Sequence, residues 1–232
     1  MTKDWHELIS QPKYEVTLEE DAWVKMRDGV RLAVDVYRPG VAGKFPALVS
    51  FSAFGKDTQK LPTSPDYRLS DPVRGTGGHE CGEQSHYVSR GYVQVIPDIR
   101  GVGKSEGKFG PGFTDNWGRD GYDLIEWIAK QPWCNGNVGM LGMSAFGAAQ
   151  HAIAGQQPPA LKAIFPFNTL TNRYHHNYYK GGILNYRFQF FASTERPIRS
   201  FEPPQSLGEF DEKELQWKIE ELQKDPDIRA NT

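Results

Sequence analysis

The most informative segment of the chain is VGMLGMSAFGAA, residues 138–149. An apolar run that reads as a strand ends at Gly142, Ser144 follows, and an Ala-rich helical pattern begins at once. This order is typical of a nucleophile elbow, a strained strand-to-helix turn that exposes a serine hydroxyl and needs small neighbours. The segment therefore predicts an α/β domain with Ser144 as candidate nucleophile. The alternative is a serine that only caps a packed helix.

Apolar runs and helical patterns on both sides of this segment extend the α/β pattern. The runs at 47–51, 92–96 and 138–141 do not alternate with polar residues, which is typical of strands buried on both faces of a parallel sheet. A further apolar run covers 161–167, and helices are predicted over 120–131, with Asp120 as N-cap and Pro132 as the stop, and over 145–156. Strands and helices in alternation predict helices on both faces of the sheet.

An antiparallel hairpin is predicted ahead of these strands, in residues 22–38. Its two extended runs meet at Asp28-Gly29, the strongest short-range hairpin signal. Apolar side chains recur at period two from Val30 to Val36.

Composition and charge exclude several classes of protein. The 232 residues carry a net charge of -2, so no basic field exists to attract nucleic acid or an anionic membrane. No apolar run is long enough to span a bilayer and the first residues lack the core of a signal peptide, so we expect a cytoplasmic protein. The two cysteines, Cys81 and Cys134, lack metal-site spacing and predict buried reduced thiols; no metal is expected.

A glycine-rich loop is predicted at residues 97–107, PDIRGVGKSEG, at the carboxyl end of a strand, where ligand sites gather. A phosphate-binding loop is the alternative interpretation. The glycine spacing fits neither the dinucleotide fingerprint nor a P-loop, so a nucleotide-binding protein is the least supported hypothesis.

Two motifs together resemble those of a known family. They are D-x-R-G-x-G-x-S-x-G from Asp98 and W-I-x-x-Q-P-W-C-N-G-N-V-G-M-L-G-M-S from Trp127. With RDGVRLAVDVYRP at 27–39 and FPALVSFSAFGKD at 45–57, the chain resembles the Xaa-Pro dipeptidyl-peptidase and cocaine-esterase family of α/β-hydrolases. The resemblance is good over residues 22–168 and loose beyond.

This resemblance implies a fold and an activity. It implies an α/β-hydrolase core, mostly parallel and incomplete, over residues 1–168, the start of a helical cap over 169–232, and a later jelly roll. The implied enzyme is a serine hydrolase that cleaves a small-molecule ester, an amide or an Xaa-Pro peptide through an acyl-enzyme, with no cofactor. A homo-oligomer is left open.

The family's site residues are carried over position by position. Ser144 matches the nucleophile, and the backbone N–H of Ala145 matches one oxyanion donor. The second donor in the family is a tyrosine hydroxyl, and this chain has Phe54 at that position. A backbone N–H near Phe54 or Gly55 is the candidate substitute.

The remaining triad members are expected beyond Thr232, because the family places its Asp and His after the cap. The chain as given is therefore expected to be inactive, and the alternative is a truncated or non-catalytic member. Asp98 and Asp115 are expected to hold loops. The histidines judged unsuited as the base are His79, His86, His151, His175 and His176.

Aromatic residues are expected mainly to pack. Trp117, Trp127 and Trp133 are predicted to belong to the core around helix 120–131. The aromatic stretch within 174–191 is expected to pack a cap onto its domain, with an acyl or proline pocket as the alternative. A further helix is predicted over 211–224, after a proline-rich break at 201–206.

Overall fold

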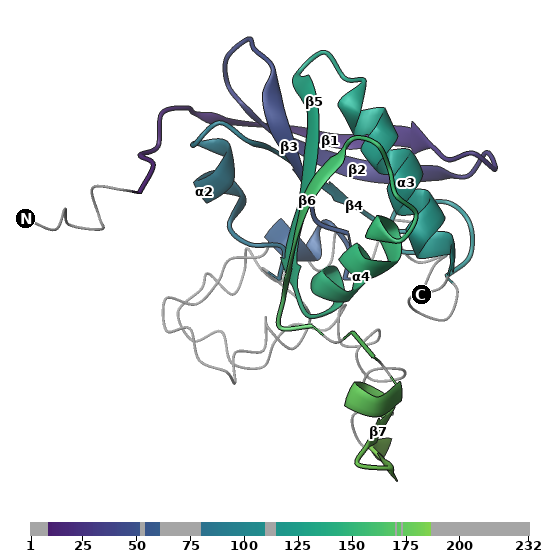
Figure 1. Cartoon of the computed structure of the whole chain (residues 1–232). Coiled ribbons are helices and arrows are strands. Elements are labelled where there is room, and N and C mark those ends of the chain that lie inside the picture. Colours follow the sequence, from purple (N-terminus) through teal and green to yellow (C-terminus); the bar gives the residue numbers. More distant parts are fainter. Residues whose placement is uncertain are drawn as a thin grey trace, which may run out of the picture.

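A six-stranded mixed sheet forms the centre of the molecule (Figure 1). The computed structural model describes residues 9–51, 54–60, 80–109, 115–169, 171–172 and 174–186. Along the sheet the order is β1-β2-β4-β3-β5-β6. The strands are β1 (Val16–Lys25), β2 (Arg31–Pro39), β3 (Phe45–Val49), β4 (Val93–Pro97), β5 (Cys134–Met143) and β6 (Leu161–Phe167).

The directions of the strands bring three loops to one edge of the sheet. β1, β2 and β4 pair antiparallel in turn, whereas β3 runs parallel to both β4 and β5, and β5 runs parallel to β6. The segments that follow β3, β4 and β5 therefore leave from the same, carboxyl edge. In open α/β sheets this is the edge where ligands bind.

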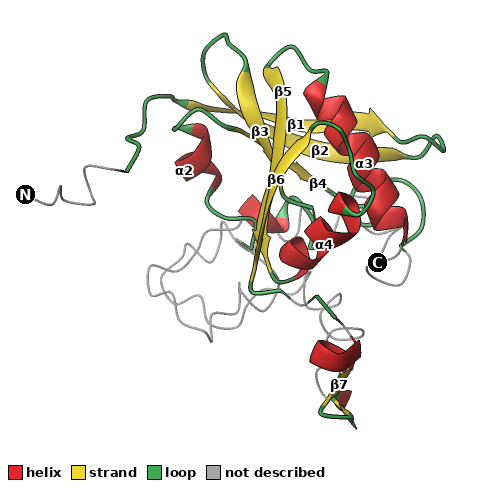
Figure 2. Ribbon diagram, in the orientation of Figure 1, coloured by secondary structure: helices red, strands yellow, loops and turns green. Residues whose placement is uncertain are grey.

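Helices cover both faces of the sheet (Figure 2). α3 (Asp115–Ala129) and α4 (Ala145–Ala154) pack on one face, and the short α2 (Gln84–Val88) lies against β2 and β4 on the other. The predicted α/β class, with a mostly parallel sheet between helices, is confirmed.

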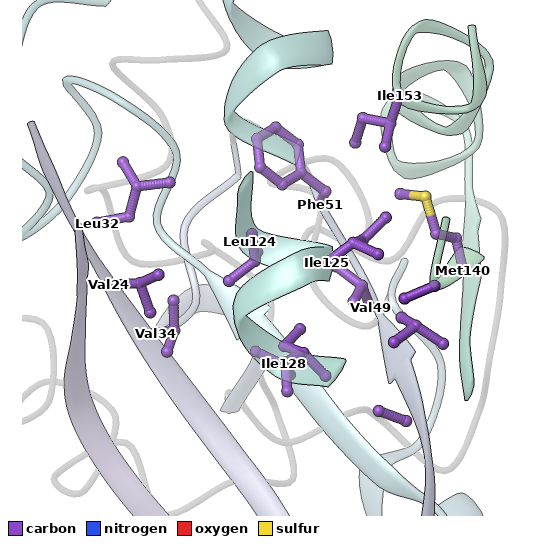
Figure 3. Close-up of a cluster of buried hydrophobic side chains, with 14 of the residues drawn as sticks. Val24, Leu32, Val34, Val49, Phe51, Leu124, Ile125, Ile128, Met140 and Ile153 are labelled. Atoms are coloured by element: carbon purple, nitrogen blue, oxygen red, sulfur yellow. The ribbon is translucent and has the colours of Figure 1, made fainter. Parts of the chain in front are cut away.

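The main hydrophobic core lies between the sheet and α3 and α4 (Figure 3). Leu124, Ile125 and Ile128 form the buried face of α3, as their helical spacing predicts, and all three are fully buried. Trp117 belongs to this core, and Trp127 and Trp133 pack against it and edge to face with each other, which confirms the packing role predicted for them.

The N-terminal hairpin forms as predicted, with Lys25 paired to Arg31 across the turn at Asp28-Gly29. β1 begins at Val16, earlier than residue 22, where the first extended run was expected to begin. Unlike a strand with one solvated face, β2 is buried on both faces, so that even Asp35 is 0 % exposed. The cause lies in the loop after β3, whose lysine ammonium groups pair with that carboxylate.

The prediction that Asp120 caps α3 is wrong. The helix begins at Asp115, and Asp120 lies within it, 3 % exposed. Its carboxylate accepts two hydrogen bonds from Arg100, at 2.9 Å from Nε and 2.7 Å from Nη2. An aspartate is an N-cap signal only where its side chain turns to its own backbone, and here the partly buried Arg100 guanidinium competes for it.

Beyond β6, the described part of the chain holds a short helical turn, Tyr174–Tyr178, and a small antiparallel pair, β7 (Tyr179–Lys180) with β8 (Ile183–Leu184). The predicted helix at 211–224 and the proline-rich break lie outside the described residues. Among the described helices, none combines the length and apolar character that a membrane crossing requires.

Candidate active site

Ser144 lies in the turn between β5 and α4, with a strained backbone. Its φ is 58° and its ψ is -114°, a combination that non-glycine residues rarely adopt. Its side chain makes no capping hydrogen bond to α4. Ser144 thus occupies the N-cap position of α4, but its hydroxyl does not cap the helix and is left unused by it.

Two glycines give the turn the room that it needs. A Cβ on Gly142, whose φ is 141°, would lie 2.3 Å from Cβ of Phe146. A Cβ on Gly147 would lie 2.9 Å from Cβ of Thr169 and 3.0 Å from the carbonyl oxygen of Phe167. The distances to Phe146 and to Thr169 are shorter than real Cβ contacts, so a larger side chain at either position would force its neighbours to shift. This is the smallness that the elbow pattern predicts.

Backbone hydrogen bonds fix the turn from both sides. The Ser144 N–H donates to the carbonyl oxygen of Phe167 at 3.0 Å, and the Met143 N–H donates to that of Glu80 at 2.8 Å. The Ser144 carbonyl accepts the N–H of Ala148 at 2.9 Å, the first bond of α4. The strain at Ser144 is therefore held by β6 on one side and by the segment before α2 on the other.

Ala145 is the first residue of α4. The first N–H groups of a helix have no partner within it, and the helix dipole places partial positive charge there. The Ala145 N–H thus lies next to Ser144 at the positive end of a ten-residue helix. A negative charge developing beside the Ser144 hydroxyl would be stabilised at this position.

Phe54 lies in the loop that follows β3 and reaches the same edge. Its ring is partly buried and lies 6.1 Å, centroid to centroid, from the ring of Phe146, two residues after Ser144. It packs against the smaller hydrophobic cluster, which consists of Tyr37, Cys81, Val88, Ile96 and Phe146. The structure thus places Phe54 against the first turn of α4. Ser52 and Ala53 lie outside the described residues.

Asp98, directly after β4, holds two loops together, as predicted for it. It is 1 % exposed, and its carboxylate accepts the backbone N–H of Lys56 at 2.7 Å and that of Lys104 at 3.0 Å. Burial raises the pKa of Asp98 to about 7. The loop role expected of Asp115 is not tested, because the side chain of this first residue of α3 lies outside the description.

The glycine-rich loop after β4 is occupied by the protein's own groups. The Asp98 carboxylate accepts the Lys104 N–H, and the Lys104 ammonium lies 2.8 Å from Oδ2 of Asp21. A carboxylate and an ion pair thus take the amide and the cation that a phosphate would need. This agrees with the rejection of a phosphate-binding loop.

None of the described histidines makes a hydrogen bond to the Ser144 hydroxyl. His86 lies in α2 and His151 in α4, while His175 and His176 lie in the turn beyond β6; His79 lies outside the description. The described residues thus offer a strained serine and a helix N-terminus without an assigned base.

In the described part of the chain, no group of three or more His, Cys, Asp or Glu side chains is arranged to hold a metal ion. Cys81 and Cys134 are free and buried, as predicted. Burial raises the pKa of the Cys81 thiol well above its usual value.

Sequence reasoning missed Lys56. Its ammonium is 1 % exposed and lies 2.7 Å from Oδ1 of Asp21, 3.3 Å from Oδ1 of Asp35 and 3.1 Å from Oδ1 of Asp57. A lysine in a loop ordinarily reads as a solvated charge. The available signal was Asp35, an acidic residue inside an apolar strand, which calls for a buried cationic partner.

Comparison with known proteins adds independent findings. The model of a family described as "X-Pro dipeptidyl-peptidase (S15 family)" matches residues 28–228. The chain is 36 % identical over 171 residues to a cocaine esterase of Rhodococcus sp. strain MB1 Bresler, which covers 73 % of this chain and 27 % of that protein. It is 28 % identical over 207 residues to a putative Xaa-Pro dipeptidyl-peptidase of Streptomyces avermitilis, with 74 % and 29 % covered.

Among solved structures, a CocE/NonD family hydrolase from Staphylococcus aureus superposes with a TM-score of 0.65 at 32 % identity, over 82 % of this chain and 34 % of that one. An α-amino acid ester hydrolase, at 22 % identity and a TM-score of 0.59, shares the fold. The chain thus spans between a quarter and about a third of the length of these relatives.

Proposed function

The chain belongs to the X-Pro dipeptidyl-peptidase (S15) family of hydrolases, and we propose that Ser144 is the nucleophile of an acyl-transfer reaction. The observation that carries the proposal is the Ser144 backbone, with φ 58° and ψ -114° between β5 and α4, and a hydroxyl that does not cap the helix. Such strain is retained where it serves a function.

The first half of the reaction would proceed at the carboxyl edge of the sheet. The Ser144 oxygen attacks the substrate carbonyl while a general base takes its proton. The carbonyl oxygen becomes an oxyanion, which the Ala145 N–H and the α4 dipole stabilise. Collapse of the tetrahedral intermediate breaks the bond to the leaving alcohol or amine, which takes up the proton, and leaves an acyl-Ser144 ester.

The second half returns the enzyme to its starting state. A water molecule gives its proton to the same base and attacks the acyl carbon through a second oxyanion. As this intermediate collapses, the base returns the proton to the Ser144 oxygen, which restores its hydroxyl and releases the acid. Side chains, backbone and water suffice for both halves, so the proposal includes no cofactor.

The base and its partner carboxylate are assigned to other parts of the protein. In the fold to which this elbow belongs, the chain order is Ser, then Asp or Glu, then His. We place both after the cap, as the family resemblance implies. The domain division is part of the same proposal: residues 1–168 form the first part of the hydrolase core, and 169–232 begin the cap. β6 ends at Phe167, next to that boundary.

The second oxyanion donor is proposed to be a backbone N–H of Phe54 or Gly55, because the phenylalanine ring has no hydroxyl. The contact between Phe54 and Phe146 places this loop against the first turn of α4. One oxyanion donor is worth roughly 100- to 1000-fold in rate, so a substitute is needed for full activity.

The substrate is proposed to be a small ester, amide or Xaa-Pro peptide. The relatives' names include both an esterase and a putative dipeptidyl-peptidase. Both reactions pass through the same attack on a carbonyl, so Ser144 and Ala145 would serve either.

A non-catalytic member of the family is the second candidate. One observation favours it: the hydroxyl that would supply the second oxyanion donor is missing at Phe54. Such a protein would keep the fold and the elbow without turnover.

Turnover by the full-length polypeptide that contains this sequence distinguishes the two. We expect it to hydrolyse p-nitrophenyl acetate, and Ser144→Ala to lower kcat by about 10⁴-fold or more while the circular dichroism spectrum is unchanged. The exposed Ser85 provides the control, because Ser85→Ala removes a hydroxyl that bonds only to Glu83 in the described structure. Ser144→Ala at the wild-type rate contradicts the assignment, and an inactive wild type supports the non-catalytic alternative.

A further inference from the structure

Asp98 connects the two loops that frame the site. One oxygen, Oδ1, accepts the N–H of Lys56, in the loop that carries Phe54. The other, Oδ2, accepts the N–H of Lys104, in the glycine-rich loop. Both bonds involve a charged acceptor that is 1 % exposed, which makes them stronger than bonds between neutral groups.

The space around this carboxylate is shaped to hold it. A Cβ on Gly103 would lie 2.3 Å from Oδ2 of Asp98, and a Cβ on Gly55 would lie 3.4 Å from Oδ1. Because Gly103 has a φ of 54° and Gly55 of 71°, both loops turn where glycine is the preferred residue. The carboxylate therefore has one position from which it reaches both amides.

Lys56 anchors the loop a second time through its side chain. Its buried ammonium lies between the carboxylates of Asp21 in β1, Asp35 in β2 and Asp57 in the loop itself, at 2.7 to 3.3 Å. A buried ammonium with several carboxylate partners resists displacement, because moving it away would leave a buried charge without a partner. The backbone at Lys56 is thus fixed from the Asp98 side and from the sheet.

We propose that Asp98 is a positioning residue for the reaction at Ser144, which it serves by holding the loop so that the backbone N–H of Phe54 or Gly55 can act as the second oxyanion donor. The inference rests on the proposed function. A tyrosine hydroxyl reaches its target on a flexible side chain, whereas a backbone N–H is placed only as well as its loop. The Phe54–Phe146 contact joins that loop to the first turn of α4, directly after Ser144.

The protonation state of Asp98 distinguishes a positioning role from a packing role, because a residue that only packs would not make the loop contacts depend on pH. Its pKa is raised to about 7 by burial and by the charge of Asp57, against the charge of Lys56 and the two backbone N–H donors. Protonation turns one oxygen into a donor, so one of the two amides loses its acceptor. The other charged groups of the surrounding network are Asp21, Asp35, Lys60 and the Lys104 ammonium.

The test compares Asp98→Asn with Asp120→Asn in the full-length polypeptide. An asparagine keeps one acceptor oxygen and replaces the other by a donor. Asp120 is the matched control because its buried carboxylate, on α3, pairs with Arg100 of the same glycine-rich loop but not with the Phe54 loop. We expect Asp98→Asn to lower kcat for ester hydrolysis by about 10- to 100-fold with little change in KM. Asp120→Asn should lower stability without this loss of kcat.

A measurement on the wild type does not depend on the variants folding. Amide hydrogen exchange by NMR should show the Lys56 and Lys104 N–H groups protected at pH 8, with one protection factor falling at pH 6. Equal kcat losses in both variants, an unchanged kcat in Asp98→Asn, or pH-independent protection of both amides would overturn the positioning role. If the wild type forms no acyl-enzyme, the proposed function fails. The exchange data then show separately whether the Asp98 carboxylate holds the N–H groups of Lys56 and Lys104, an arrangement that we call the Asp98 clamp.

Discussion

The turn at Ser144 follows β5, which pairs with β6, but the side chains of the turn and of β6 lie in different surroundings. At the turn, Phe146 is 1 % exposed and glycines fill the places where no side chain fits. On β6, Phe165 is 67 % exposed and Phe167 is 57 % exposed. Yet the β6 backbone supports the turn, since the Phe167 carbonyl accepts the Ser144 N–H and the Phe165 carbonyl accepts a bond from Gln150.

The contacts that fix the candidate site therefore differ from those that would cover the edge of the sheet. The geometry of Ser144 is fixed by contacts among the described residues. The outer side chains of β6 are not covered by them, and an exposed apolar edge strand invites pairing with further chain or with other molecules. The site geometry should therefore depend on Gly142 far more than on the phenylalanines of β6.

The largest effect is expected from crowding the turn. Gly142→Ala places a Cβ 2.3 Å from Phe146 in a backbone region that disfavours side chains, and should lower the free energy of unfolding by about 2–4 kcal/mol. Gly136→Ala is the control: its φ of 87° is also positive, but nothing lies within 4 Å. That change should cost about 1 kcal/mol. Urea unfolding measures both, and equal costs would show that the turn is not crowded.

A second effect concerns pH and the Asp98 clamp. Because the pKa of Asp98 is raised in the folded protein, the folded state binds its proton more tightly than the unfolded state. The Asp98 contribution should thus lower the free energy of unfolding as pH rises from about 4 to about 7, by up to about 1.4 kcal/mol per pH unit, and level off above. In Asp98→Asn this downward slope should be absent. Urea titrations at four pH values test this, and parallel curves for the two proteins would contradict it.

The Phe54 position should give a smaller, opposite effect. If the backbone near Phe54 only partly replaces the family's hydroxyl, Phe54→Tyr should raise kcat of the full-length polypeptide by up to about tenfold, since it adds a donor to the oxyanion. Phe54→Leu controls for changes in packing against Phe146. An unchanged or lower kcat in the tyrosine variant would show that the backbone already fills this role.

The smallest effect on stability is expected at β6. Because Phe165 is mostly exposed, Phe165→Lys in the 232-residue polypeptide should change the free energy of unfolding by less than about 0.5 kcal/mol. It should nevertheless reduce aggregation and the binding of a hydrophobic dye, because a charge on an edge strand opposes association. A large loss of stability would show that this side chain is packed.

The features that could be predicted from the sequence are those that depend on local pattern, and the features that could not depend on distant partners. The strands, α4 and the elbow were predictable because local patterns, such as the uninterrupted apolar run before Gly142, agree with the packing that the fold imposes. The start of α3 was not, because the role of Asp120 depends on Arg100, twenty residues away in the chain. The buried ammonium of Lys56 was equally hidden, since its partners come from β1, β2 and its own loop.

Within the site, residue identity was easier to predict than arrangement. The pattern around Ser144 indicated a turn, and the structure shows the positive φ and the excluded side chains that such a turn requires. The clamp at Asp98 was anticipated only as a loop-holding role. The amide groups that donate hydrogen bonds to Asp98 could not be predicted, because they depend on how the loops pack. Lys56, one of the donors, lies 42 residues from Asp98 in the sequence.

The assignment of Ser144 is tested most directly by mapping a covalent fluorophosphonate adduct by mass spectrometry. In the full-length polypeptide we predict one adduct, on the peptide that contains Ser144, and none after Ser144→Ala. The 232-residue polypeptide alone should react no faster than background, because a serine without a positioned base is a weak nucleophile. An adduct on a different residue, or no adduct on a folded full-length protein, would contradict Ser144 as the nucleophile. Stoichiometric labelling of the 232-residue polypeptide would contradict the placement of the base after the cap.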